Sequence, residues 1–265
     1  MIQKNKIGVL GCGWLGIPLS KSLIKNNNIV FGTTTDKFKL SVLSSYKIKP
    51  FLINVTEKEI LGEWNNFFKK LDILIITIPP KENMNYNFII KTLFEKIKGS
   101  NQIKLIFVSS TSVYGNMQGN VNSSTIPKPD SKRGSAIIKA ENILKRNPQT
   151  TILRLGGLIG PNRNPARILS SKKIVHNPNN PINLIHIDDC IGIIESIIKK
   201  EKWGKIYLGV CPHHPTKESY YNTQCVKLGI SKINFSESPI SSNKKINDKN
   251  IIEDLKYNYK KPSLR

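Results

Sequence analysis

Short apolar runs alternate with amphipathic stretches along the first 160 residues of the chain. Each run is rich in Val, Ile, Leu and Phe and is bounded by polar or turn residues, which is typical of a strand buried on both faces of a sheet. Between the runs, apolar residues recur at intervals of three and four, the period of an amphipathic helix. The predicted strands span 6–10, 29–33, 49–53, 71–78, 103–109 and 151–155, and the clearest helices span 15–25, 85–97 and 133–146. This alternation predicts an α/β fold with a doubly wound parallel sheet, covered by helices on both faces.

The pattern changes after Gly160, where Pro, Asn and Ser become more frequent. An amphipathic helix is predicted over 189–200 and a strand over 205–209, with Asp188 and Asp189 placed where they could cap the helix. We expect a main domain over 1–160 and a smaller C-terminal substrate lobe over 161–265, with 183–210 returning to the main core. The lobe is predicted to lie over the carboxyl edge of the sheet, where ligands bind in such folds. The polar stretch 236–250 is predicted to be an exposed loop, and 256–261 a tail that ends the chain.

Composition and cysteine spacing indicate the cellular compartment in which we expect the protein. The 265 residues are 38% hydrophobic, enough for one sizeable core, and no apolar run approaches the roughly 18 residues of a membrane span. The first residues lead directly into a strand without the features of an export signal. The four cysteines lie far apart and form no CxxC pair, so we expect neither disulfides nor a metal site. These features predict a cytoplasmic protein with no membrane partner.

The net charge of +23 is the one compositional feature that suggests nucleic acid. Only six of the 41 basic residues are arginine, however, and the lysines are spread along the chain. Phosphate and base recognition favours the forked guanidinium, with basic residues clustered on one face. We therefore interpret the lysines as a solvated surface and expect no specific nucleic-acid partner.

A glycine-rich loop links the first predicted strand to the first predicted helix. Its residues are Gly11, Cys12, Gly13, Trp14, Leu15 and Gly16. In a GxGxxG loop at this position, the first glycine permits a tight turn, the second lets the backbone approach a pyrophosphate, and the third lets helix and strand pack closely. The helix N-terminus adds free N–H groups and a positive dipole end. The loop, with Trp14 and Leu15 included, is predicted to bind a nicotinamide dinucleotide in a Rossmann domain.

The end of the second strand bears on the choice of dinucleotide. An NAD site usually carries a carboxylate there to accept hydrogen bonds from the ribose hydroxyls. Here the strand runs into Thr34 and Thr35, and Asp36 follows beside Lys37 and Lys39. Hydroxyl and ammonium groups suit a 2′-phosphate better, so Thr34, Thr35 and Lys37 favour NADP, with NAD as the alternative. If the threonines only cap a helix, the choice stays open.

Several segments together resemble the extended short-chain dehydrogenase/reductases, the NAD-dependent epimerase/dehydratase family, and more narrowly its atypical YeeZ-like subgroup. They span nearly the whole chain in the expected order. The segments are the glycine-rich loop, Gly32-Thr33-Thr34-Thr35, Thr77-Ile78-Pro79-Pro80, Ser109-Ser110-Thr111-Ser112-Val113-Tyr114-Gly115, 153–161, 183–189 and 259–263.

This resemblance implies roles for particular residues. Ile78 and Pro79 would contact the cofactor. Ser110 would hydrogen-bond the reacting oxygen of the substrate, although its hydroxyl could instead satisfy backbone at the strand end. Family members also carry a catalytic Tyr-x-x-x-Lys pair on the next helix, and this sequence lacks it. The two positions fall on Arg133 and Ile137, or on Ser135 and Lys139 if the alignment shifts by two.

Arginine is scarce in this chain, so its positions are informative. Arg163 lies in the loop after the sixth predicted strand, which should face the active-site crevice, and we predict that it binds an anionic group of substrate or cofactor. A structural ion pair is the alternative. Arg154, within that strand, is interpreted as structural, and His186 as a structural hydrogen-bonding residue.

These inferences predict an oxidoreductase, or an epimerase/dehydratase-like protein, acting with NADP(H) on a small polar and possibly sugar-nucleotide-like substrate. The missing Tyr-x-x-x-Lys pair supports a second hypothesis, a catalytically silent dinucleotide-binding sensor or scaffold. The substrate and the oligomeric state, a homodimer among the options, stay open at this point.

Overall fold

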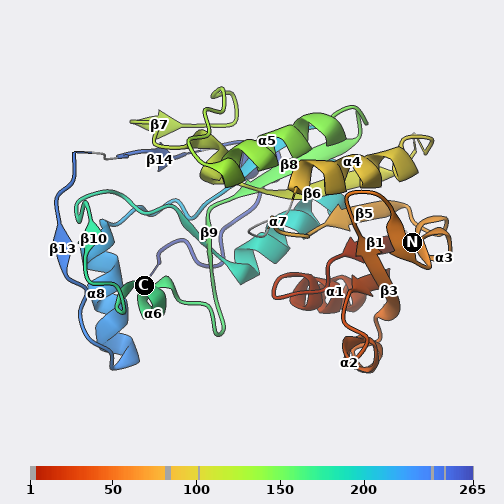
Figure 1. Ribbon diagram of the computed structural model, residues 1–265, viewed down its shortest axis with the longest axis horizontal. Helices are drawn as coiled ribbons and strands as arrows, with labels where there is room; N and C mark the ends of the chain where they lie inside the picture. The colour runs from red at the N-terminus through yellow and green to blue at the C-terminus, as the bar shows by residue number, and fades with distance from the viewer. Residues whose placement is uncertain (1–3, 81–84, 101, 240–241, 248, 265) are drawn as a thin grey trace.

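A mostly parallel sheet organises the molecule (Figure 1). The computed structural model describes residues 4–80, 85–100, 102–239, 242–247 and 249–264. The order of the eight-stranded sheet is β12-β8-β6-β5-β1-β2-β3-β4, and its strands pair in parallel except for the antiparallel pair β3–β4. Its strands are β1 (Lys6–Leu10), β2 (Ile29–Thr34), β3 (Lys49–Val55), β4 (Ile60–Gly62), β5 (Ile73–Ile76), β6 (Lys104–Ser110), β8 (Thr150–Leu155) and β12 (Ile206–Gly209). The predicted doubly wound Rossmann sheet is confirmed.

Helices cover both faces of this sheet because successive strand residues point to opposite sides. In β1, Leu10 belongs to one apolar core and Val9 to the other. The first core contains residues of α3 (Trp64–Phe68), α4 (Tyr86–Ile97) and α5 (Lys132–Leu144). The second core contains residues of α1 (Gly16–Lys25), α2 (Lys39–Ser45), α7 (Ile187–Lys199) and α9 (Asn250–Glu253). In Figure 1, α4 and α5 lie on the side of the sheet opposite α1.

A smaller lobe follows β8 and has its own apolar cluster. It contains β9 (Gly157–Ile159), α6 (Pro165–Leu169), β10 (Val175–His176), β11 (Leu184–His186), α8 (Lys217–Leu228) and β13 (Phe235–Ser236). Between β11 and α8 the chain returns to the main body, where α7 packs against α1 and β12 extends the sheet beside β8. No helix in the described residues is long and apolar enough to cross a membrane.

Three sequence predictions for the second half are wrong. The stretch 236–250 is not wholly an exposed loop, because β14 (Lys245–Ile246) pairs with β7 (Asn120–Val121) and buries Ile246. Asp188 and Asp189 do not cap α7; His186 does, its Nδ1 accepting from the Asp188 N–H at 3.2 Å. The segment 256–261 is more than a tail, because Tyr257 is buried in the second core. The burial of Ile246 and of Tyr257 arises from contacts distant in sequence, whereas the cap at His186 is a local contact.

Candidate functional site

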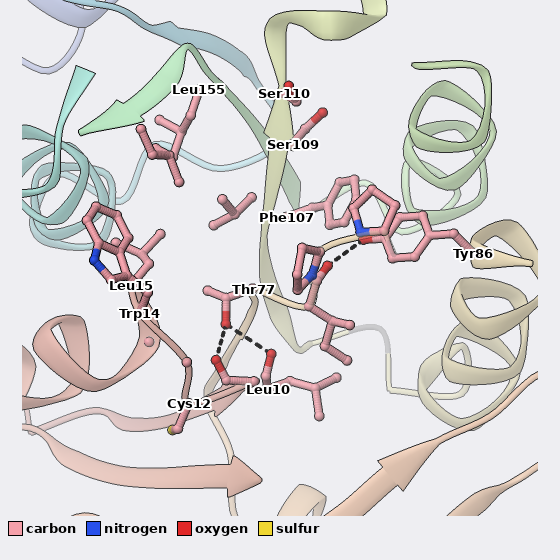
Figure 2. Close-up of a pocket in the computed structure, with 18 of the residues that line it drawn as sticks. Leu10, Cys12, Trp14, Leu15, Thr77, Tyr86, Phe107, Ser109, Ser110 and Leu155 are labelled. Carbon is pink, nitrogen blue, oxygen red and sulfur yellow. Dashed lines mark hydrogen bonds between the residues drawn. The ribbon is translucent and has the colours of Figure 1, made fainter. Parts of the chain in front are cut away.

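A cavity of about 790 Å³ opens at the carboxyl ends of the central strands (Figure 2). Leu10 ends β1, Thr34 ends β2, Ser110 ends β6 and Leu155 ends β8, and all four line the cavity. Thr77, directly after β5, lines it too. The carboxyl edge beside the central crossover is where doubly wound sheets bind ligands. We refer to this space as the main cavity.

The glycine-rich loop forms one wall of the main cavity, and hydrogen bonds from neighbouring strands fix its shape. Gly11 has φ +108°, which suits glycine, and its N–H donates to Thr33 Oγ1 at 3.0 Å. The Thr77 hydroxyl donates to the carbonyl of Gly11 at 2.8 Å (Figure 2). At Gly16 an added Cβ would lie 2.4 Å from that carbonyl oxygen, so only glycine permits this approach of helix to strand.

Gly13 differs from the other two glycines because an added Cβ there would meet nothing within 4 Å. The loop is therefore open on its cavity side at this residue. The first N–H groups of α1 have no acceptor within the helix and carry the positive end of its dipole. A diphosphate fits this cradle in both shape and charge, so the residues present match a dinucleotide cofactor.

The far end of the main cavity meets the turn after β2. Thr34, Thr35 and Lys39 line it, whereas Lys37 is not among the lining residues. The reason lies in the turn: the Thr34 hydroxyl accepts from the Asp36 N–H at 3.1 Å, and α2 then begins at Lys39. The threonines do not cap α2. The structure thus places Lys39 at the position that the sequence analysis gave to Lys37.

Trp14 connects the glycine-rich loop to the loop after β9. Its indole Nε1 donates to the carbonyl of Pro161 at 3.0 Å. The Arg163 guanidinium stacks over the indole ring at 4.9 Å from its centroid. Leu15, Trp14 and Arg163 all line the main cavity, so the sequence-predicted anion ligand lies beside the predicted cofactor loop. In the described residues Arg163 forms no ion pair, contrary to the structural alternative.

Hydroxyl groups gather where β6 meets the main cavity. Ser110 lines it, and its Oγ accepts from the Ser112 N–H at 3.2 Å. Ser112 also lines it, and its Oγ is buried with no hydrogen-bond partner among the described residues. The sequence analysis named Ser110 and missed Ser112, whose position two residues later in the same segment was the available signal. A buried hydroxyl without a partner is costly unless a ligand satisfies it.

Helix α5 forms one wall of the main cavity. It contains the positions at which family members have the catalytic Tyr-x-x-x-Lys pair. Arg133 and Ile137, one helical turn apart, line the main cavity, while Ser135 and Lys139 do not. Of the two alignments considered for the Tyr-x-x-x-Lys positions, only the first places both positions among the described lining residues. Neither residue is a phenol or an amine, so the arrangement of proton donor and ammonium typical of the family is absent from the described part of the wall.

Tyr86 is the phenol that lines the main cavity among the described residues, and the sequence analysis did not identify it. Its hydroxyl donates to the carbonyl of Ile78 at 2.8 Å (Figure 2). Burial raises the pKa of Tyr86 well above its ordinary value, and the charge of Arg133 acts in the opposite direction without offsetting the shift. Ile78 and Pro79, which the sequence analysis assigned to cofactor contact, line the cavity. Tyr86 thus supports the part of the cavity wall at Ile78. Its raised pKa makes it a poor proton donor near neutral pH.

A buried ion pair between Arg154 and Glu141 contacts Ser109, which lines the main cavity beside Ser110. Arg154 is 1% exposed and donates from Nε and Nη2 to the two Glu141 carboxylate oxygens at 2.9 and 2.6 Å. Ser109 donates to the same carboxylate at 2.6 Å, and Arg154 Nη1 donates to the Tyr114 hydroxyl at 2.6 Å. Burial acts to lower the pKa of Arg154, and Glu141 outweighs it, so that the pKa is raised. The structural role predicted for Arg154 is confirmed.

Comparison with known proteins identifies relatives of the whole chain. No family model matches the sequence. Protein YeeZ of Escherichia coli K12 is 31% identical to this chain over an alignment of 267 residues. The alignment covers 97% of this chain and 97% of YeeZ.

Solved structures share the fold. A conserved protein of unknown function from Silicibacter pomeroyi superposes with a TM-score of 0.81 at 19% identity, covering 99% of this chain and 96% of the other. UDP-glucuronic acid 4-epimerase from Bacillus cereus, in complex with NAD, has a TM-score of 0.78 at 19% identity, with coverage of 98% and 94%. A putative NAD-dependent epimerase/dehydratase from Methylobacillus flagellatus has a TM-score of 0.79 at 21% identity, with coverage of 98% and 95%. The chain therefore belongs to the YeeZ family and has the Rossmann fold of NAD-dependent epimerases and dehydratases.

Proposed function

We propose that this protein binds NADP(H) in the main cavity and uses it in an oxidoreductase or epimerase/dehydratase-like reaction on a small polar substrate. The observation that carries the proposal is the open cradle at Gly13, where the glycine-rich loop and the start of α1 face a cavity of about 790 Å³. That volume lies within the range of roughly 300–1,000 Å³ typical of ligand sites. A bound nicotinamide would supply or accept a hydride.

The end of β2 favours NADP over NAD. Thr35 and Lys39 line the cavity there and offer a hydroxyl and an ammonium group to a 2′-phosphate. Asp36, the acidic residue of this turn, is not among the lining residues, and its carboxylate accepts from the Phe38 N–H at 3.0 Å. The Asp36 carboxylate also lies 3.8 Å from the Lys39 ammonium group at an exposed ion pair, so Lys39 would exchange this partner for the 2′-phosphate.

Ser110, Ser112 and Arg163 supply the polar groups on the substrate side. The two hydroxyls at the end of β6 would hydrogen-bond the reacting oxygen, and the unpartnered Ser112 hydroxyl supports a ligand at this point. Arg163, held over Trp14, would orient an anionic group. Together they would hold the reacting carbon in a fixed orientation, the chief requirement for hydride transfer.

A dinucleotide-binding sensor or scaffold is the second candidate. Arg133 and Ile137 occupy the wall where a catalytic tyrosine and lysine would stand, and this observation favours it. Such a protein would bind the same cofactor through the same loop and would not oxidise or reduce any substrate.

Calorimetric titration of the purified protein with NADPH and NADH tests the proposal. We expect NADPH to bind more tightly, and Lys39→Gln to weaken NADPH binding about tenfold while leaving NADH binding unchanged. Lys37→Gln is the matched control, because Lys37 lies two residues away outside the cavity lining. Absence of binding by either dinucleotide would refute the proposal. If both variants behave like the parent protein, the choice of NADP is wrong and NAD takes its place.

Assays of NADPH consumption with small carbonyl compounds then separate the two candidates. Consumption that Ser110→Ala lowers at least tenfold, with NADPH affinity retained, supports an enzyme. Because an epimerase or dehydratase returns the hydride to its substrate, the same compounds are also analysed for conversion without net NADPH consumption. Tight binding with neither NADPH consumption nor conversion of any compound in the panel supports the sensor.

A further inference from the structure

A second, smaller cavity of about 210 Å³ lies in the lobe, beside the main cavity. Four segments form it: the end of β9 with the loop that follows, the end of β11, helix α8 and residues near the C-terminus. Their polar side chains include Arg163, His186, Gln224, Lys261 and Ser263. Figure 1 shows the C-terminus beside α6 and α8, where these segments meet. We call this space the second cavity.

The C-terminal strap, residues 257–264, is anchored to the protein body rather than free. The fully buried Asp189 carboxylate accepts from the Tyr257 hydroxyl at 2.8 Å and from the Lys260 and Lys261 N–H groups at 2.6 and 3.1 Å. Leu264 is buried in the apolar cluster of the lobe. Lys261 therefore enters the wall of the second cavity on a backbone fixed at both sides.

The second cavity carries uncompensated positive charge. Among the described residues, neither Arg163 nor Lys261 has a carboxylate within 4 Å. Asp188 is not among the residues that line the second cavity, although its carboxylate lies 3.2 Å from Nδ1 of the lining residue His186. Two cations with an amide and a hydroxyl beside them match the donor set that binds a carboxylate or a phosphate.

Arg163 lines both cavities, so the two spaces are adjacent at this residue. We propose that the second cavity binds the carboxylate or phosphate group of a compact substrate whose reacting carbon lies in the main cavity beside Ser110. This inference rests on the proposed function only where it places the reacting carbon in the main cavity. The anion site itself does not depend on it. The volume, about 210 Å³, is smaller than the roughly 300–1,000 Å³ of typical ligand sites and fits an acidic group, not a whole nucleotide. The substrate class is therefore a small acid or phosphate ester, in place of a sugar nucleotide.

Calorimetry with inorganic phosphate and with acetate tests this site. The protein is first saturated with NADPH, which keeps the probes from binding at the glycine-rich loop. We expect saturable binding of one probe, weakened about tenfold by Lys261→Gln and by Arg163→Gln. Lys260→Gln and Arg167→Gln are matched controls, since both residues are exposed and line neither cavity. Preference for phosphate or for acetate assigns the group.

The outcomes separate this inference from the proposed function. If NADPH binds but neither probe does, or if the controls weaken binding as much as Lys261→Gln, the anion site is refuted and the cofactor site stands. If NADPH does not bind, the titration is repeated with Gly13→Glu protein, whose glycine-rich loop is blocked. Phosphate or acetate binding that still depends on Lys261 then supports the anion site although the proposed function has failed.

Discussion

The three glycines of the dinucleotide loop should respond differently to substitution, and Gly13 gives the sharpest test. An added side chain at Gly13 meets nothing within 4 Å, so Gly13→Asp should fold normally. Its carboxylate would project toward the path of the cofactor diphosphate. At about 4 Å and an effective dielectric constant near 20, two like unit charges repel by about 4 kcal/mol. That corresponds to a loss of roughly a thousandfold in NADPH affinity.

Gly16→Ala should show the opposite signature. Its Cβ would lie 2.4 Å from the carbonyl oxygen of Gly11, so helix α1 must move away from the strand. Forcing an extra methyl group into a packed site costs about 1–3 kcal/mol of unfolding free energy. For a chain of this size, that shift lowers the melting temperature by very roughly 2–12 °C.

Calorimetric NADPH titration and thermal unfolding, measured on the same preparations, check both expectations. Gly99→Asp is the control for Gly13→Asp, because Gly99 also has nothing within 4 Å of an added Cβ and lies outside the cavity lining. The control should keep both its affinity and its melting temperature. If Gly13→Asp binds NADPH within threefold of the parent protein while remaining folded, the diphosphate does not lie on this loop.

Three further predictions concern the rest of the chain. Glu141→Ala leaves its buried arginine partner unpaired and should lower the unfolding free energy by about 3–5 kcal/mol in urea titration, whereas Glu95→Ala, at an exposed ion pair, should leave it essentially unchanged. The hydrogen bond from Lys205 lowers the pKa of Asp254, so the stability it supplies is present above the ordinary aspartate pKa and is lost as the pH falls through the lowered value. Asp254→Asn should therefore flatten the fall in melting temperature below about pH 4. Burial raises the pKa of Cys12 to about 11, so native protein at pH 8 should react slowly with iodoacetamide at this residue; rapid labelling would contradict its burial.

The sequence was sufficient for the parallel sheet because each buried strand is a continuous apolar run. It was insufficient for α2, in which Leu43 is the one fully buried residue and no apolar stripe exists. The C-terminal strap was missed for a different reason. Tyr257 occupies space that exists because Gly192, far away in sequence, has no side chain: a Cβ there would lie 2.4 Å from the phenol oxygen. No local pattern encodes that contact.

The same distinction applies to the site. The glycine-rich loop is a local motif, and its strand and helix context could be recognised from sequence alone. Choosing between Lys37 and Lys39 required the geometry of the turn after β2. Tyr86 enters the site through contacts distant in sequence, because its hydroxyl donates to the carbonyl of Ile78 after β5 and its ring stacks on Phe107 of β6. Arg163 was selected for its scarcity and its loop, but its stacking on Trp14 could not be foreseen because 149 positions separate the two residues along the chain.

The wall at Arg133 constrains what chemistry the main cavity can perform. A guanidinium stays protonated, so Arg133 cannot exchange a proton at neutral pH, and Ile137 has no ionisable group. The hydroxyl of Tyr86 is directed to the carbonyl of Ile78 and its pKa is raised. None of these three described residues is therefore placed to donate a proton in the reduction of a carbonyl, while a positive charge at Arg133 would stabilise a developing alkoxide. Binding without turnover requires neither step, so conversion of a substrate, with or without net coenzyme oxidation, is the observation that separates an enzyme from a sensor with the same cofactor site.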